Sequence, residues 1–459
     1  MITGDRASSL FFQKDFSTAE LTSRRARLVE VMGTGIAIIP SATEVAGFDP
    51  FRQSNDFYYL TGVEVPHAYL VMDGGTKTAS LYLPPLDEKR EKINGPCLSV
   101  EDADFVLAKT GIEQVRPISN LLKDVTDLPR IWLIRSPAEG YRQCQDTLGH
   151  YLKSVRDDPL DGRASRETNL MLRLAQLSPR AEFPDLSPLI HRQRLVKSPA
   201  EIELMRKAGR LSALACAEAM KATRPGIYEF QLGAVADYLF QINGAQGGGY
   251  TPIIATGTNI WQMHYWRNST QLQDGDLLLF DYAPDINNYT SDIGRMWPVN
   301  GKFSATQREI YGFVLQHHKT LLSLIRPGRT KEEVLSQAAE ILRPVVEKTN
   351  WSKPIYKAGA INLLASSRPL SHGVGMPVHE AAKWADRPME PGLVFAVDPE
   401  LVIPGEQLYI RVEDTIVVTE NGIENLTASC PCEIAEIEAL VGGQGILQQN
   451  PPTMTNPGR

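Results

Sequence analysis

The second half of the chain carries two copies of one helix pattern, and this repeat constrains the possible fold more than any other feature. The first copy begins with Ser-Pro-Ala-Glu at 198–201, and its helix breaks at Arg-Pro-Gly, 224–226. The second begins with Ser-Ala-Thr-Gln at 304–307 and breaks at Arg-Pro-Gly, 326–328. A serine followed three residues later by Glu or Gln is typical of a helix N-terminus. The sequence therefore predicts two related helix pairs in the same order along the chain.

A strand pattern follows each helix pair and repeats in the same way. It reads DGDLLLFD at 274–281 and PGLVFAVD at 391–398. Each strand ends in an acid six residues after its glycine, and a second acid follows on the next predicted strand. The four acids are Asp281 and Asp292 in the first copy, and Asp398 and Glu413 in the second. If the two copies meet about a pseudo-twofold axis, all four carboxylates converge on one centre.

Convergent acids of this kind favour a metal site. A single acid after an apolar strand is most often exposed in a turn, because burying it without a partner is costly. Four acids at equivalent positions, together with a histidine, shift the interpretation to metal binding. Oxygen ligands with one imidazole suit Mn²⁺, Co²⁺, Fe²⁺ or Zn²⁺, and two metals roughly 3.5–4 Å apart need bridging carboxylates. Asp292 and Glu413, which match in the repeat, are the expected bridges.

Three histidines stand in glycine-rich surroundings and are candidates for the same site. His372 and His379 both lie in LSHGVGMPVHE, 370–380, where glycines allow close approach of the backbone. His264 follows GGGYTPIIATGTN, 247–259, a segment typical of a substrate-facing turn. A lone histidine is more often structural, but the chain has only eight, so two in one such segment favour a functional role.

The first part of the chain predicts a separate mixed α/β domain. LTSRRARLVEVMG, 21–33, predicts a helix that ends at Gly33. Segments with β-branched and aromatic residues between turn residues predict strands, namely 35–41, 58–63, 68–74, 79–85 and 131–136. Helices between such strands would cover a sheet.

The domain boundary is expected in or just after a segment rich in Pro, Asp and Arg, 155–190. The whole chain is then an α/β (α+β) protein with an N-terminal domain over 1–180 and a catalytic domain over 181–443. Residues 444–459 are rich in Gln, Pro and Asn, which predicts a disordered tail.

The composition of the chain limits which partners and which cellular location are expected. The net charge is −7, so the basic surface that follows a nucleic-acid backbone is not expected. Five cysteines form no disulfide framework, and Cys430 with Cys432 would supply only half of a zinc site. No apolar run of about 18 residues and no signal-peptide core are found, which predicts no membrane association and a soluble, cytoplasmic protein.

Several segments resemble the pita-bread metallopeptidases, the creatinase and methionine aminopeptidase-like family, and within them the Xaa-Pro aminopeptidase (aminopeptidase P) group. The resemblance extends from FRQSNDFYYLTG at 51–62 to about Leu440. SDIGRMWPVNGKFSATQREIY is its most specific stretch, and the other motifs lie nearer the C-terminus; these segments span 291–311, 370–380, 391–400 and 409–427. The implied fold is a creatinase-like α/β domain followed by a pita-bread catalytic domain with an internal pseudo-twofold repeat.

The resemblance also implies roles for individual residues. The five metal-ligand positions fall on Asp281, Asp292, His372, Asp398 and Glu413. His264 and His379 fall on histidines that bind substrate or move protons, and Arg411 falls on an arginine beside the last ligand, expected to contact substrate. The implied activity is release of the N-terminal residue from Xaa-Pro-peptides with two divalent ions, Mn²⁺ before Co²⁺, Fe²⁺ or Zn²⁺. A homo-oligomer, dimer or tetramer, is also implied.

The chain departs from the family pattern at one expected ligand. Asp398-Pro399-Glu400 stands where the family has glutamate followed by Pro-Gly. Because aspartate is one methylene shorter, either the backbone moves in, or the metal shifts, or that metal binds more weakly. Arg368 stands where the aminopeptidase P group often has a further histidine. Three alternatives follow: a prolidase restricted to dipeptides, another C–N hydrolase of this fold, or a catalytically silent binding protein.

Overall fold

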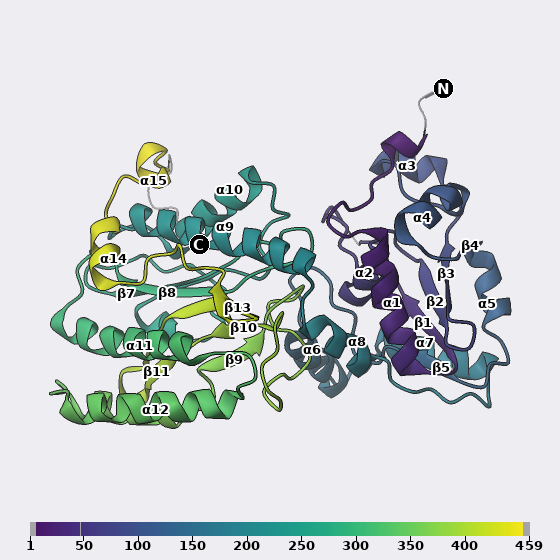
Figure 1. Cartoon of the computed structure of the whole chain (residues 1–459). Coiled ribbons are helices and arrows are strands. Elements are labelled where there is room, and N and C mark those ends of the chain that lie inside the picture. The colour runs from purple at the N-terminus through teal and green to yellow at the C-terminus, as the bar shows by residue number, and fades with distance from the viewer. Residues whose placement is uncertain (1–5, 46, 453–459) are drawn as a thin grey trace. The chain divides into compact units, whose positions relative to one another are not determined.

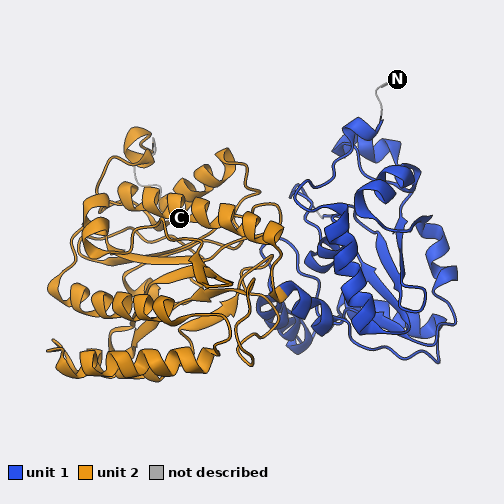
Figure 2. Cartoon of the chain, in the orientation of Figure 1, with its two compact units in different colours: residues 1–194 blue, residues 195–459 orange. Residues whose placement is uncertain are grey.

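The structure is a computed structural model that describes residues 6–45 and 47–452. The chain divides into two compact units, residues 1–194 and 195–459, coloured blue and orange in Figure 2. Among the described residues, no helix combines the length and the apolar character needed to cross a bilayer.

The first unit contains a five-stranded sheet with helices around it (Figure 1). Its helices are α1 (Thr18–Met32), α2 (Asn55–Thr61), α3 (Glu88–Asn94), α4 (Ala103–Thr110), α5 (Leu121–Asp124), α6 (Gln145–Asp157), α7 (Arg166–Leu177) and α8 (Ser187–Leu195), the last ending at the boundary. Its strands are β1 (Ile36–Pro40), β2 (Tyr69–Asp73), β3 (Thr78–Leu83), β4 (Gln114–Pro117) and β5 (Ile131–Leu133). The strand order is β4-β3-β2-β1-β5, with parallel pairs β3–β4 and β1–β5.

One of the strands predicted in this unit is wrong. Residues 58–63 lie largely in α2, which begins after Ser54 and ends at Gly62, a left-handed residue with φ 65°. Phe57, Tyr58 and Leu60 are all buried, so the aromatic run that suggests a strand instead belongs to a short helix buried on all sides. Four of the predicted strands, near 35–41, 68–74, 79–85 and 131–136, are present as β1, β2, β3 and β5.

The second unit contains the repeat (Figure 1). Its helices are α9 (Pro199–Ala222), α10 (Glu229–Ile242), α11 (Ala305–Leu324), α12 (Lys331–Lys348), α13 (Pro354–Ala365), α14 (Ile434–Leu440) and α15 (Ile446–Gln449). Its strands are β6 (Ile253–Thr256), β7 (Leu277–Asp281), β8 (Ile293–Pro298), β9 (Leu370–Gly373), β10 (Val394–Val397), β11 (Glu400–Ile403), β12 (Leu408–Arg411), β13 (Glu413–Thr419) and β14 (Gly422–Asn425). In the predicted tail, α15 is described, and residues 453–459 lie outside the described part.

The strand order of the main sheet reflects the repeat. The sheet has seven strands: six lie in the order β6-β7-β8-β13-β10-β9, and β14 pairs with β13 beside them. Within the order of six, each copy contributes three strands in mirrored order, and the copies meet at β8 and β13. These two strands are antiparallel, with Glu413 opposite Gly294 and Asp414 opposite Ile293. The second copy alone carries an inserted hairpin, β11–β12, between its second and third strands. The internal pseudo-twofold repeat predicted from the sequence is therefore confirmed.

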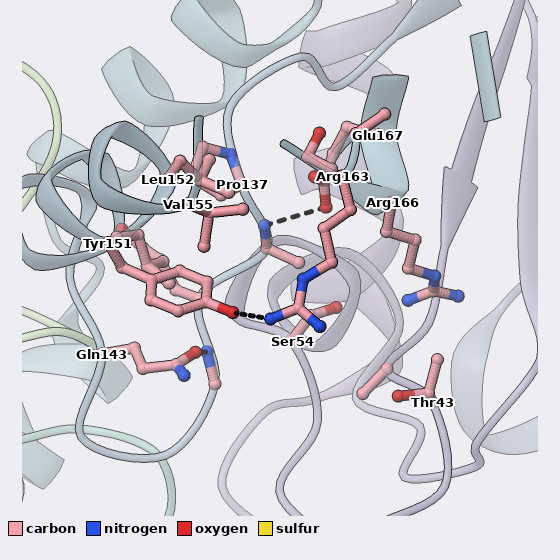
Figure 3. A pocket seen from close by; sticks show the side chains of 17 residues that line it. Thr43, Ser54, Pro137, Gln143, Tyr151, Leu152, Val155, Arg163, Arg166 and Glu167 are labelled. Atoms are coloured by element: carbon pink, nitrogen blue, oxygen red, sulfur yellow. Dashed lines mark hydrogen bonds between the residues drawn. The ribbon is translucent and has the colours of Figure 1, made fainter. Parts of the chain in front are cut away.

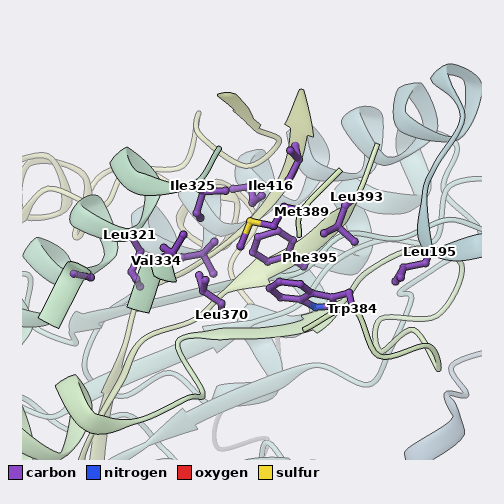
Figure 4. Packing of buried hydrophobic residues seen from close by; sticks show 13 residues of the cluster. Leu195, Leu321, Ile325, Val334, Leu370, Trp384, Met389, Leu393, Phe395 and Ile416 are labelled. Carbon is purple, nitrogen blue, oxygen red and sulfur yellow. The ribbon is translucent and has the colours of Figure 1, made fainter. Parts of the chain in front are cut away.

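Helix caps and an apolar cluster fix the helices on this sheet. The hydroxyl of Ser198 accepts from the amide of Glu201 at 3.2 Å, and that of Ser304 accepts from the amide of Gln307 at 3.1 Å. Figure 4 shows side chains of α11, α12 and the second-copy strands packed together, with Phe395 of β10 among them. The ends of the strands, and the acids that follow them, are thereby held at fixed positions.

Candidate metal centre

Three of the acids singled out by the repeat come together where the two copies meet. Asp281 ends β7, Asp292 immediately precedes β8, and Glu413 begins β13. One carboxylate oxygen from each lies within 4.8 Å of the others. The hydroxyl of Thr415 accepts from the amide of Asp292 and donates to its carbonyl, both at 2.8 Å. This double contact fixes Asp292 against the opposite copy.

Arg411 ties Asp398 to this group. Its Nε donates to Asp398 at 2.7 Å, its Nη1 donates to Asp281 at 2.9 Å, and its Nη2 donates to Glu413. Asp398 is not in the 4.8 Å group, but it shares the guanidinium with two of its members. We call Asp281, Asp292, Asp398 and Glu413 the carboxylate cluster. All four are at most 8% exposed.

The neighbouring glycine makes this arrangement possible. A Cβ at Gly294 would lie 2.8 Å from Oε2 of Glu413 and 3.0 Å from Nε of Arg411. Any side chain there would displace the guanidinium or the carboxylate. Gly294 therefore keeps open the space in which Arg411 bonds the cluster.

Tyr250 links the two aspartates of the first copy. Its hydroxyl lies 2.8 Å from Oδ1 of Asp281 and 2.9 Å from Oδ1 of Asp292. A phenol has one proton, so it can donate to only one of these oxygens at a time. The two carboxylates therefore share a single donor on this side.

Burial governs the ionisation of the cluster. It raises the pKa of Asp292 to about 7, and the charge of Asp281 adds to the effect while Arg411 opposes it. Burial also raises the pKa of Asp398, and it holds the pKa of Glu413 well above its usual range. One guanidinium is thus too little positive charge for four buried carboxylates.

His372 approaches the cluster from β9. Its Nε2 lies 3.5 Å from Oδ2 of Asp292, and its Nδ1 lies 3.3 Å from the carbonyl oxygen of Gly373. With Nδ1 donating to that carbonyl, Nε2 presents its lone pair toward the cluster, as is usual for a metal-binding histidine.

The other two predicted histidines lie beyond His372. The ring centres of His372 and His379 are 4.0 Å apart, and those of His379 and His264 are 6.0 Å apart. His379 also places a nitrogen within 4.8 Å of ligand atoms of Asp292 and His372. His264 is exposed, whereas His372 and His379 are partly buried. The three imidazoles thus run outward from the cluster.

The donor set fits divalent cations. It offers carboxylate oxygens and an imidazole nitrogen, which suit Mn²⁺, Fe²⁺, Co²⁺ and Zn²⁺. Oε1 of Glu413 is buried and has no hydrogen-bond partner among the described residues, so it is available as a ligand. Carboxylates with too little positive charge and an unused oxygen are what a cation site requires.

A cavity of about 490 Å³ in the first unit lacks such chemistry (Figure 3). Its polar side chains are engaged locally, since Arg163 donates to the hydroxyl of Tyr151 at 3.2 Å and Glu167 accepts from the amide of Ala138 at 3.2 Å. It contains no histidine. The carboxylate cluster is therefore the better candidate for catalysis.

The sequence patterns do not identify two residues at the metal centre, Tyr250 and Glu400. Tyr250 lies in the glycine-rich segment 247–259, which predicts a substrate-facing turn but no contact with the acids. Glu400 is visible only as a departure from the family pattern, yet it is buried beside Arg411. An aromatic hydroxyl in a glycine-rich loop beside a strand is the one signal that points to Tyr250.

Comparison with known proteins defines the class. The model of metallopeptidase family M24 matches residues 203–420, and that of the aminopeptidase P N-terminal domain matches residues 21–130. The chain therefore belongs to metallopeptidase family M24, with the N-terminal domain of aminopeptidase P. The family resemblance and the fold class predicted from the sequence are confirmed.

The chain is also similar to individual peptidases over most of its length. The chain is 33% identical to Xaa-Pro aminopeptidase of Escherichia coli K12, over 93% of this chain and 98% of that protein. It is 30% identical to mitochondrial intermediate cleaving peptidase 55 of Arabidopsis thaliana, over 92% and 82%. The solved structures of E. coli aminopeptidase P in a low-pH form and of the Zn-substituted enzyme with product each match with a TM-score of 0.74 and 31% identity, over 93% of this chain and 99% of theirs.

Proposed function

We propose that this protein is a metal-dependent Xaa-Pro aminopeptidase that releases the N-terminal residue from peptides with proline in the second position. The observation that carries the proposal is the convergence of Asp281, Asp292 and Glu413 beside His372, in a chain alignable with E. coli Xaa-Pro aminopeptidase over 93% of its length. This support is stronger than an isolated acidic cluster would give, because here the family and the set of ligand atoms point to the same chemistry.

We assign the metal-ligand role to the four members of the carboxylate cluster and to His372. Their donors suit two divalent ions, with Mn²⁺ as the first choice. When bound, such ions polarise the scissile carbonyl and activate water. We expect the Asp398 side of the site to be the weaker one, because aspartate is one methylene shorter than the glutamate of the family pattern.

The protein's own groups would do the remaining work. His379 and His264 face outward from the cluster, where a peptide would enter, and a protonated imidazole there can donate to the leaving proline nitrogen. The same donors can stabilise charge on the carbonyl oxygen. Arg411 is buried and has three donors committed to carboxylates, which supports a positioning role in place of the substrate contact predicted from the sequence.

The substrates would be proline-containing peptides, and the location would be the cytoplasm, which five free cysteines support. A dimer or tetramer remains a prediction. No observation favours the prolidase, the other C–N hydrolase or the silent binding protein over the proposed Xaa-Pro aminopeptidase.

The test uses purified protein loaded with Mn²⁺. An Xaa-Pro tripeptide should lose its first residue, an Xaa-Pro dipeptide should be cut more slowly, and a matched peptide with alanine in the second position should be resistant. Asp292→Asn should abolish cleavage, while the exposed Glu420→Gln should not. Intact Xaa-Pro tripeptide in the presence of bound metal would refute the proposal.

A further inference from the structure

A fifth acid, Glu400, lies beside the carboxylate cluster. It begins β11 and stands directly opposite Arg411 in the β11–β12 hairpin. Its side chain is only 7% exposed, and its Oε1 is buried with no hydrogen-bond partner among the described residues. A buried carboxylate oxygen without a donor is costly unless something positive binds it.

The nearby arginines do not meet this requirement. Arg411 already donates to three other carboxylates through Nε, Nη1 and Nη2. Arg368 lies 3.6 Å from Oε2 of Glu400, but its side chain is 62% exposed, so solvent screens its charge. Oε1, the other oxygen, accepts no hydrogen bond from either guanidinium.

The position of Glu400 matches a shortfall at Asp398. Aspartate is one methylene shorter than glutamate, a loss of reach of about 1.5 Å. Asp398 is also held by Arg411 at 2.7 Å and fixed through its amide to the carbonyl of Pro369 at 2.8 Å. Its carboxylate therefore has little freedom to move toward a cation. Glu400, two residues later, is longer and has an uncommitted oxygen.

We infer that Glu400 is a further ligand of the metal centre, supplying Oε1 to the cation on the Asp398 side. This inference rests on the proposed function, because it assumes that the cluster holds cations. Glu400 would then supply the side-chain length that Asp398 lacks. A ligand role also gives a reason for burying an acid at the first residue of β11.

The experiment titrates metal-free protein with Mn²⁺, followed by the electron paramagnetic resonance signal of free Mn²⁺ and by calorimetry. The wild type should bind two ions per chain. Glu400→Gln should weaken one of them by about 10–100-fold, the range found when groups supporting a metal site are removed, and leave the other unchanged. Glu420→Gln, an exposed acid in the same unit, removes the same charge and should alter neither site.

A second variant separates reach from charge. Adding Asp398→Glu to Glu400→Gln restores length without restoring the lost charge, so it should recover most of the affinity. Thermal unfolding of the metal-free proteins checks that each variant is folded. Two wild-type affinities in Glu400→Gln, or no recovery in the double variant, would overturn the inference. A wild type that binds Mn²⁺ at two sites but leaves Xaa-Pro-peptides intact would contradict the proposed function alone.

Discussion

Replacing Arg411 with methionine tests how the cluster is held together without metal. The substitution keeps much of the side-chain volume but removes the guanidinium that bonds Asp281, Asp398 and Glu413. Removing one partner of a buried ion pair typically costs about 3–5 kcal/mol. For a unit of this size we expect the unfolding temperature of metal-free protein to fall by roughly 6–20 °C.

The assay is thermal unfolding in EDTA, with the transition of the second unit followed separately, because a two-unit chain need not unfold in one step. Arg308→Met is the matched control, since Arg308 pairs with Glu438 at a site where its side chain is 46% exposed. It should cost less than about 1 kcal/mol. Saturating Mn²⁺ should narrow the gap between Arg411→Met and wild type, because cations then neutralise the same carboxylates. A loss below about 1 kcal/mol in EDTA, equal to that of the control, would refute the reasoning.

Two further predictions concern other buried groups. Tyr250→Phe removes the single donor shared by Asp281 and Asp292; calorimetry should show a change in Mn²⁺ affinity, and an unchanged affinity together with unchanged kcat/KM would contradict a role for the hydroxyl. His317 is buried, and this lowers its pKa to about 4. Because the unfolded imidazole has a pKa near 6.5, its contribution to stability is complete above that pH and is lost as the pH falls toward 4. At pH 5 the loss is about 2 kcal/mol relative to neutral pH. Urea unfolding should show this loss in wild type and a smaller one in His317→Phe; equal losses would disprove the assignment.

The parts of the fold that the sequence predicts well are those with local physical signals. Ser198 and Ser304 cap their helices because a hydroxyl accepts from a free amide, and this requires only neighbours in the sequence. The strand that ends at Asp281 and the strand that ends just before Asp398 are short apolar runs with turn residues before them. Their repetition also points to the mirrored order of the sheet, which no single strand could reveal.

The predictions that are wrong or missing concern features set by packing between segments that are far apart in the sequence. Residues 58–63 have strand-like composition, but the surrounding core buries them as a helix, and tertiary context overrides such a preference. The contacts of Tyr250 and Glu400 depend on where a loop and a hairpin lie in space. The sequence therefore indicates which residue types gather at the metal centre. It does not show that Asp281 and Asp292 share the hydroxyl of Tyr250, or that Oε1 of Glu400 has no hydrogen-bond donor among the described residues.

The junction between the two copies has a mechanical consequence. The backbone ladder between β8 and β13 has two residue pairs, and the hydroxyl of Thr415 adds contacts to Asp292 at the same place. Asp292 belongs to one copy and Glu413 to the other, so if both hold the same cation they cross-link the halves where two backbone pairs join them. Metal loading should then slow amide hydrogen exchange at Ile293, which pairs with Asp414 across the junction, more than at Leu278 and Leu279 in the longer β7–β8 pairing. Neither half could hold that cation alone, so a chain cleaved and separated between the copies would lose the site altogether.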